Sequence, residues 1–212
     1  MPQDYQDFDR LDFASNYRTH NPIIRHLLDR FYVRLEKALQ SQIADASSAL
    51  EVGAGEGYST SIITEVVRAH RGKLFVSDLI PELMLRNKTR SGEANLLVQD
   101  IMKLAIRSGE IDVVVALEVF EHLPDPRLGL REIARVARRS AVISVPFEPW
   151  WRLGNIARGA YLRDLGNTPD HVNHWGRKSF TGFLLREFAK VEVTVSFPWL
   201  IGVCELPRKV SL

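Results

Sequence analysis

Short apolar runs alternate along the chain with segments in which apolar residues recur at helical spacing. A short continuous apolar run is typical of a buried strand, whereas a period of about 3.6 residues is typical of an amphipathic helix. The pattern predicts strands at 48–52, 73–77, 95–98, 111–116 and 140–145, and helices at 57–70, 80–90, about 118–122 and 127–138. Strands that alternate with helices in this way predict a parallel sheet with helices on both faces.

The two ends of the chain frame this alternation. Pro22 follows Asn21, a good helix cap, and apolar residues at helical spacing predict a helix over residues 22–40. Residues 191–197 and 200–206 are two strand-like runs with no helix between them, which predicts an antiparallel hairpin at one edge of the sheet.

One segment interrupts the alternation. Residues 147–178 follow the fifth strand and are rich in tryptophan, arginine and histidine. A long excursion at the carboxyl end of a strand in an open α/β sheet is frequently a ligand-facing element. A cap that only covers apolar sheet area is the alternative interpretation.

No composition break separates a second domain, so a single domain of 212 residues is expected. We divide it into an N-terminal arm and helix, a first half that ends with the fifth strand, the insertion, and a C-terminal helix with its hairpin: residues 1–40, 41–146, 147–178 and 179–212.

The overall composition changes this picture little. The sequence is 45% hydrophobic and 25% charged, with 28 basic and 26 acidic residues, as in an ordinary globular domain. The near balance of charge gives no indication of a nucleic-acid partner. A single cysteine, Cys204, excludes an internal disulfide and a multi-cysteine metal site. No segment is apolar over the length of a membrane span, and the polar N-terminus is unlike a signal peptide, so a cytoplasmic protein is expected.

The most specific motif joins the first strand to the following helix. Glu51 is followed by Gly53, Gly55 and Gly57 in a G-x-G-x-G spacing. Glycines allow positive φ and let a ligand approach the backbone at the start of a helix. Dinucleotide sites use G-x-G-x-x-G instead, and a carboxylate beside the loop would repel a pyrophosphate. The loop therefore predicts a ligand with a cationic group.

This loop, together with acids after the later strands, resembles the class I S-adenosylmethionine-dependent methyltransferases over most of the chain. The resemblance implies a Rossmann-like, doubly wound α/β fold. Its sheet would be seven-stranded and mostly parallel, with an antiparallel C-terminal edge strand and helices on both faces. It also implies S-adenosylmethionine (SAM) as cofactor and S-adenosylhomocysteine (SAH) as product, with residues 41–146 as the cofactor-binding half.

Each expected cofactor contact corresponds to a residue after a strand. Asp78 ends the second strand, and its two oxygens suit the two hydroxyls of a ribose. Leu79 is expected to pack on the adenine. The resemblance implies that Asp100 accepts a hydrogen bond from the adenine amine and that the Ile101 backbone N–H bonds to a ring nitrogen. It also implies that Glu51 lies near the amino-acid end of the cofactor, above the glycine loop.

The fourth-strand signature of the family is matched by the run IDVVVALEVFEHLPDP, which is especially like that of quinone-biosynthesis O-methyltransferases and other small-molecule methylases. By this resemblance Glu118 lies beside the sulfonium. Glu118, Glu121 and His122 stand at i, i+3 and i+4, so on a helix they would project from one face. This spacing resembles the E-x-x-E-H motif of metal-dependent members, which His171 or His174 would complete. A divalent metal is therefore a candidate cofactor, and a loop-anchoring role for His122 is the alternative.

The implied reaction is in-line transfer of a methyl group to a small-molecule or lipid-like acceptor, which depends on alignment and exclusion of water. His122, His171 and His174 are the candidate bases if the acceptor is a hydroxyl. A non-catalytic SAM-binding relative and an NAD(P)-dependent oxidoreductase are the alternatives, and Asp100 counts against the second. No nucleic-acid partner is expected, while the acceptor atom and the oligomeric state stay open.

Two further groups complete the expected site. An apolar acceptor pocket with cations for an anionic group would come from Trp150, Trp151, Trp175, Phe180, Arg152, Arg158 and Arg163. A lid over the cofactor would come from Tyr17, Thr19 and His20. The alternatives are that the tryptophans form the core of a cap and that the N-terminal residues form an ordinary arm.

Overall fold

The computed structural model describes residues 21–92, 94–157 and 159–207. The proposed lid residues Tyr17, Thr19 and His20 lie outside the described residues, as does Arg158. The elements follow one another in the order α1 (Pro22–Ile43), β1 (Ser48–Val52), α2 (Tyr58–Ala69), β2 (Lys73–Asp78), α3 (Pro81–Ser91), β3 (Asn95–Val98), β4 (Ile111–Leu117), η2 (Phe120–His122), α4 (Pro126–Val136), β5 (Ala137–Pro146), α5 (Trp150–Ala157), η3 (Leu162–Asp164), α6 (Arg177–Leu184), β6 (Lys190–Ser196) and β7 (Trp199–Glu205).

The strands form one seven-stranded sheet in the order β3-β2-β1-β4-β5-β7-β6. Every neighbouring pair is parallel except the two that involve β7. The predicted fold is confirmed, and the C-terminal hairpin forms one edge with β6 outermost. The strand order reverses between β1 and β4, which is the position where open α/β sheets bind ligands.

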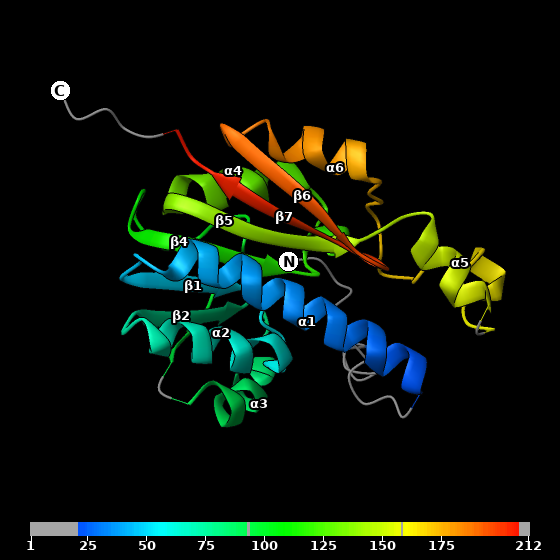
Figure 1. Ribbon diagram of the computed structural model, residues 1–212, viewed down its shortest axis with the longest axis horizontal. Helices are drawn as coiled ribbons and strands as arrows, with labels where there is room; N and C mark the ends of the chain where they lie inside the picture. The colour runs from blue at the N-terminus through cyan, green and yellow to red at the C-terminus, as the bar shows by residue number, and fades with distance from the viewer. Residues whose placement is uncertain (1–20, 93, 158, 208–212) are drawn as a thin grey trace.

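Helices cover both faces of the sheet (Figure 1). One core lies under α1, α2 and α3, and the other lies under η2, α4 and α6. Strand β4 shows why its sequence is continuously apolar: Val113 and Val115 face the first core, whereas Val114 and Ala116 face the second. A central parallel strand buried on both sides needs apolar residues at every position.

The predicted boundary between α4 and β5 is wrong, and α1 ends at Ile43 rather than at residue 40. The helix expected at 127–138 ends at Val136, and β5 begins at Ala137 rather than at residue 140. β5 begins with two exposed polar residues, Arg138 and Arg139. Arg138 donates a hydrogen bond to the carboxylate of Asp112 in the adjacent strand β4. The run of apolar residues in the sequence therefore starts at residue 140, although the backbone of β5 already pairs with β4 at Ala137.

Among the described residues, no helix combines the length and apolar character needed to cross a bilayer.

Candidate active site

The loops after β1 and β4 lie against each other at the carboxyl end of the sheet. Gly53 has φ +68°, and a Cβ on it would lie 2.4 Å from Cγ2 of Val119, just after β4. Gly57 has φ +85°, and a Cβ on it would lie 2.8 Å from the side-chain amide carbon of Asn87. These two positions need glycine for both conformation and space. A Cβ on Gly55 would meet nothing within 4 Å, so its side of the loop is open.

The carboxylate of Glu51 lies beneath the first turn of α2. It accepts hydrogen bonds of 2.6 Å from the hydroxyls of both Ser59 and Thr60, and it is 1% exposed. Burial raises the pKa of Glu51 to about 7. The side chain thus supports the glycine loop, and the expected proximity of Glu51 to the cofactor stays a prediction.

Asp78 joins the loops after β1 and β2. Its Oδ2 accepts from the Gly55 backbone N–H at 2.8 Å and its Oδ1 accepts from the Ile80 N–H at 3.0 Å. Burial raises the pKa of Asp78. Each carboxylate oxygen has a second lone pair, so the same group can still accept from a ribose. Leu79 beside it is 43% exposed, as a residue that packs on a ligand would be in the free protein.

Asp100 forms a turn after β3. Its Oδ1 accepts from the backbone N–H of Met102 at 2.8 Å, which uses one of its two oxygens. Ile101 is buried in the core beneath α4. Both positions lie at the carboxyl end of β3, on the same side as Asp78, and their expected contacts with the adenine stay predictions.

Glu118 stands directly after β4 in a left-handed conformation, with φ +56°. Its carboxylate accepts from the Ser144 hydroxyl at 2.8 Å and from the Trp199 side chain. Burial and the neighbouring Glu121 raise the pKa of Glu118 well above its usual range. The prediction that Glu118, Glu121 and His122 share one face of a helix is wrong, because the helical turn begins at Phe120 and is a 3₁₀ turn.

A second cluster forms where η2 meets the insertion. Glu121, His122 and His171 each offer a ligand atom within 4.8 Å of the others. Asp170 lies beside them, with its Oδ2 3.0 Å from Nδ1 of His122. Within the described part of the chain, Oε2 of Glu121 is buried and has no hydrogen-bond partner. Of the expected ligand set, Glu121, His122 and His171 therefore come together, and Glu118 does not join them.

The cluster holds its titratable groups in different states. Burial favours a neutral ring, but the Asp170 hydrogen bond and the Glu121 charge raise the pKa of His122 to about 9. Burial and the positive charge of His122 lower the pKa of His171 to about 4. Burial raises the pKa of Glu121 to about 7, against the attraction of His122. At neutral pH His122 is thus cationic and His171 is neutral.

Backbone contacts fix the insertion on η2. The N–H groups of Val172 and Asn173 both donate to the carbonyl of Glu121, at 2.9 and 3.1 Å. The Asn173 side chain donates to the carbonyls of Phe120 and Leu123, at 3.0 and 2.7 Å. Asn173 and Asp170 are site residues that the sequence interpretation missed. In the sequence they stand only in a mostly polar run that begins at Asp170, and this run does not indicate what either residue does.

The four expected pocket aromatics do not form one pocket. Phe180 is fully buried in the core, and Trp175 packs on Phe183 with ring centroids 4.5 Å apart. Trp150 is 46% exposed. Only Trp151 touches the cluster, stacked on His171 at 6.0 Å. The sequence could not distinguish these positions, because aromatic residues of a core and of a ligand site look alike in a sequence.

His174 takes no part in the cluster. Its Nε2 lies 2.9 Å from the Arg152 guanidinium and 2.7 Å from Oδ1 of Asn167. Burial and then the charge of Arg152 lower the pKa of His174. Arg152 also faces Glu148 at 3.9 Å, and Arg163 is exposed.

With this arrangement in view, residues 50–145 match a family model described as a methyltransferase domain. This match supports the resemblance to the class I S-adenosylmethionine-dependent methyltransferases that the sequence indicates. SAM as cofactor and SAH as product agree with this match and with the relatives named below. The glycine loop, Glu51 and Asp78 all lie within the matched region.

Curated relatives and solved structures agree with this assignment. The chain is 27% identical to a probable S-adenosylmethionine-dependent methyltransferase of Mycobacterium tuberculosis over 121 residues, 56% of this chain and 43% of that protein. It is 24% identical to a probable methyltransferase of the same kind from Mycolicibacterium smegmatis over 186 residues, 85% of this chain and 68% of that protein. The chain thus spans less than half the length of the first of these relatives.

The fold is similar to that of magnesium protoporphyrin IX methyltransferase from Synechocystis PCC 6803 with bound SAH. The TM-score is 0.66 at 14% identity, with 94% of each chain covered. This similarity concerns the fold. The expected resemblance to quinone-biosynthesis O-methyltransferases stays a prediction.

Proposed function

We propose that the protein transfers a methyl group from SAM to a small-molecule or lipid-like acceptor held between η2 and the insertion. The observation that carries the proposal is the contact of Gly53 with Val119, because it brings the cofactor loop against the loop that leads to the Glu121 cluster. The proposed sites for SAM and for the acceptor then lie next to each other, where the strand order reverses between β1 and β4. An in-line displacement requires this proximity.

The residues at this end fit an adenosyl cofactor. The backbone of the loop is free of side chains at Gly53, Gly55 and Gly57, and Leu79 offers an exposed apolar surface. SAM supplies an already activated methyl group, so the protein mainly aligns the acceptor and excludes water. The buried carboxylates of Glu118 and Glu121 favour a cation beside them.

For a hydroxyl acceptor, we infer that Glu121 Oε2 receives the proton. Its pKa of about 7 matches a base that works near neutral pH, and it is the unpartnered atom of the cluster. His122, with its pKa near 9, is cationic and stabilises the Glu121 carboxylate, while a pKa near 4 makes His171 a weak base. This proposal differs from the expectation of a histidine base, which stays a prediction.

A divalent metal is the second candidate for the same cluster. The ligand atoms of Glu121, His122 and His171 lie close enough to share one ion, and neutral His171 suits a metal. His122 must lose a proton before it can bind, so metal affinity should rise with pH. A metal here would orient an oxygen acceptor and lower its pKa.

Glu121→Gln and treatment with a chelator separate the two roles. Both should abolish methyl transfer if a metal is held, whereas only the substitution should do so if Glu121 is a base. Release of SAH, measured with hydroxylated apolar compounds, with a short RNA and with an unfolded protein, identifies the acceptor class. SAH release with the RNA or the protein alone would contradict the proposed class, and its absence with all three while SAM binds would favour a non-catalytic relative.

Cofactor binding is tested at Asp78. Asp78→Ala should weaken SAM binding roughly tenfold to a hundredfold, because it removes hydrogen bonds to a charged acceptor. Asp78→Asn is the matched control, since its amide oxygen can still accept from the Gly55 N–H. Calorimetric affinities that do not change in Asp78→Ala would contradict the ribose assignment.

A further inference from the structure

The cap, defined as residues 150–166, presents apolar side chains away from the protein. Its exposed large apolar residues are Trp150, Leu153, Ile156, Tyr161, Leu162 and Leu165. The two leucines near its tip are the most exposed, Leu162 at 58% and Leu165 at 74%. Apolar residues that gather on one exposed segment indicate an interaction surface.

The cap is folded tightly on itself. Asn155 is 3% exposed and donates to the carbonyl of Gly166 at 2.8 Å. A Cβ on Gly166 would lie 2.3 Å from the carbonyl oxygen of Arg152, so the segment folds tightly back on α5. Tyr161 and Leu165 have φ values of 52° and 49°, a left-handed conformation that side chains rarely adopt. Local packing thus holds the tip in one shape.

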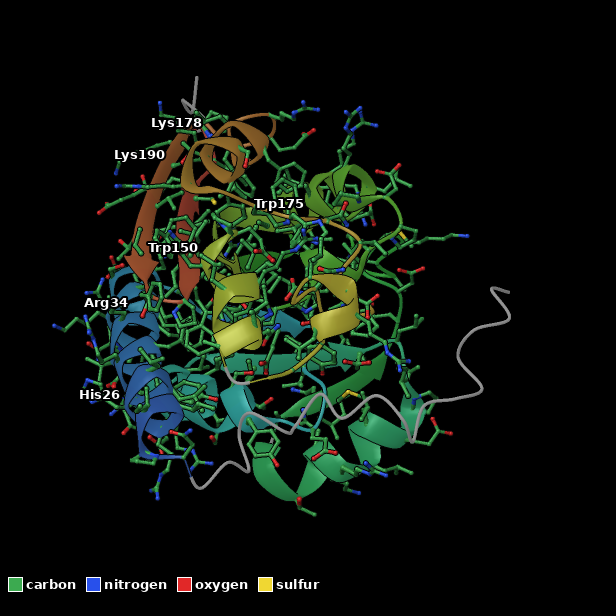
Figure 2. The ribbon with its side chains drawn as sticks, turned by 90° about the vertical axis from the view of Figure 1, so that its right-hand side faces the viewer. His26, Arg34, Trp150, Trp175, Lys178 and Lys190 are labelled. Atoms are coloured by element: carbon green, nitrogen blue, oxygen red, sulfur yellow. The ribbon has the colours of Figure 1, made fainter. Side chains whose placement is uncertain are left out.

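The charge of the cap identifies its partner. Residues 150–166 contain three arginines, Arg152, Arg158 and Arg163, and one acid, Asp164, and Arg152 faces Glu148 just outside the cap, which leaves a net charge of +1. Figure 2 looks onto this end of the molecule, with α5 toward the viewer and Trp150 beside it. Lys178 lies at one border of the same view. Exposed apolar residues among cations match the surface of an anionic bilayer.

The position of the cap favours a surface over a groove. In Figure 1, α5 projects beyond the end of the sheet toward which the parallel strands point. A projecting tip can enter the boundary between headgroups and acyl chains, whereas a protein groove would have to enclose it. The inner side of the same segment carries Trp151, which stacks on His171 in the candidate active site.

We propose that the cap docks this enzyme on anionic lipid bilayers, with Leu162 and Leu165 inserted and Arg163 among the headgroups. One consequence rests on the proposed function: an apolar acceptor can then reach the cluster around Glu121 directly from the bilayer. The docking itself depends only on the exposed residues of the cap.

Sedimentation of the full chain with vesicles tests the docking. Vesicles of equal parts phosphatidylglycerol and phosphatidylcholine should retain the protein, and pure phosphatidylcholine should retain much less. The double variant L162S/L165S should bind at least about tenfold more weakly, because it removes two inserted side chains. L85S is the matched control, because Leu85 is 71% exposed on α3 and lies outside the cap. R163Q should weaken binding about fivefold, and only to the anionic vesicles.

Equal vesicle binding by the wild-type protein and L162S/L165S would overturn the proposal. So would a protein that ignores vesicles but forms a dimer that L162S/L165S dissociates, since a second copy would then cover the cap. SAM affinity, measured on the same samples, separates this proposal from the proposed function. Vesicle binding without SAM binding would contradict only the function, and SAM binding without vesicle binding would contradict only the docking.

Discussion

The cofactor loops and the insertion are held in place in different ways. The contacts around the cofactor loops are short in sequence. The N–H groups of Gly55 and Ile80, which are 23 and 2 residues away from Asp78, both donate to its carboxylate. The insertion depends instead on contacts across the chain: Asn173 bonds to Phe120 over 53 residues. The proposed cofactor site and the proposed acceptor site therefore depend on separate contacts, and a substitution in one should leave the other unchanged.

Gly53→Ala should have the largest effect, on the cofactor side. The new Cβ would lie 2.4 Å from Cγ2 of Val119, on a backbone with φ +68°. We expect a loss of about 4 kcal/mol in the free energy of unfolding, from left-handed strain and overpacking together, and weaker SAM binding. Urea unfolding measures the first quantity and calorimetry the second.

Gly55→Ala is the control for that substitution. Its φ of +54° strains the same kind of backbone, but its Cβ would meet nothing within 4 Å. About 1 kcal/mol is expected from the backbone alone. Equal losses for the two variants would show that the two loops do not approach each other as closely as described.

The pH dependence of stability should reveal the buried Glu51. Burial raises its pKa from 4.5 to about 7, so between these values the folded protein holds a proton that the unfolded chain releases. The free energy of unfolding should therefore fall as pH rises through this window, by on the order of 3 kcal/mol. Glu51→Gln should remove this part of the dependence. Parallel curves for the two proteins in urea unfolding from pH 4 to pH 8 would contradict the assignment.

Asn173→Ala tests the acceptor side. It leaves the carbonyls of Phe120 and Leu123 without their side-chain donor and loosens the insertion. Methyl transfer should fall by about 2 kcal/mol in transition-state stabilisation, roughly thirtyfold, while SAM affinity changes less than about twofold. Val172→Ala, at the exposed neighbouring position, is the control. A parallel loss of SAM affinity would mean that the two regions are coupled.

Leu79→Ala should have the smallest effect. Leu79 is 43% exposed, so its loss should change the free energy of unfolding by less than about 0.5 kcal/mol. SAM binding should weaken about fivefold because the adenine loses an apolar contact. Calorimetry with SAM checks this, with Leu85→Ala, at an exposed position on α3, as the control. A loss of stability without a loss of affinity would place Leu79 in the core instead.

The fold and the cofactor loops could be predicted because their signals are local. Continuous apolar runs such as β4 follow from burial on both faces, and the glycine spacing follows from the φ values of Gly53 and Gly57. Even the wrong boundary of β5 has a local cause, since Arg138 and Arg139 start the strand with exposed polar residues.

The acceptor side could be predicted only in part, because its contacts are long-range. The sequence indicated Glu121, His122 and His171, but the 3₁₀ turn at η2 moved Glu118 out of their group. No pattern pairs Asp170 with His122 across 48 residues. Phe180 looked like a pocket residue because aromatic residues of a core and of a ligand site have the same sequence signature.

The most direct test of the account is a calorimetric titration of the full chain with SAM and, separately, with NADH. The glycine loop, Asp78 and the buried carboxylates predict saturable binding of SAM with one site per chain and no binding of NADH. Binding of NADH without binding of SAM would contradict the cofactor assignment on which the rest depends.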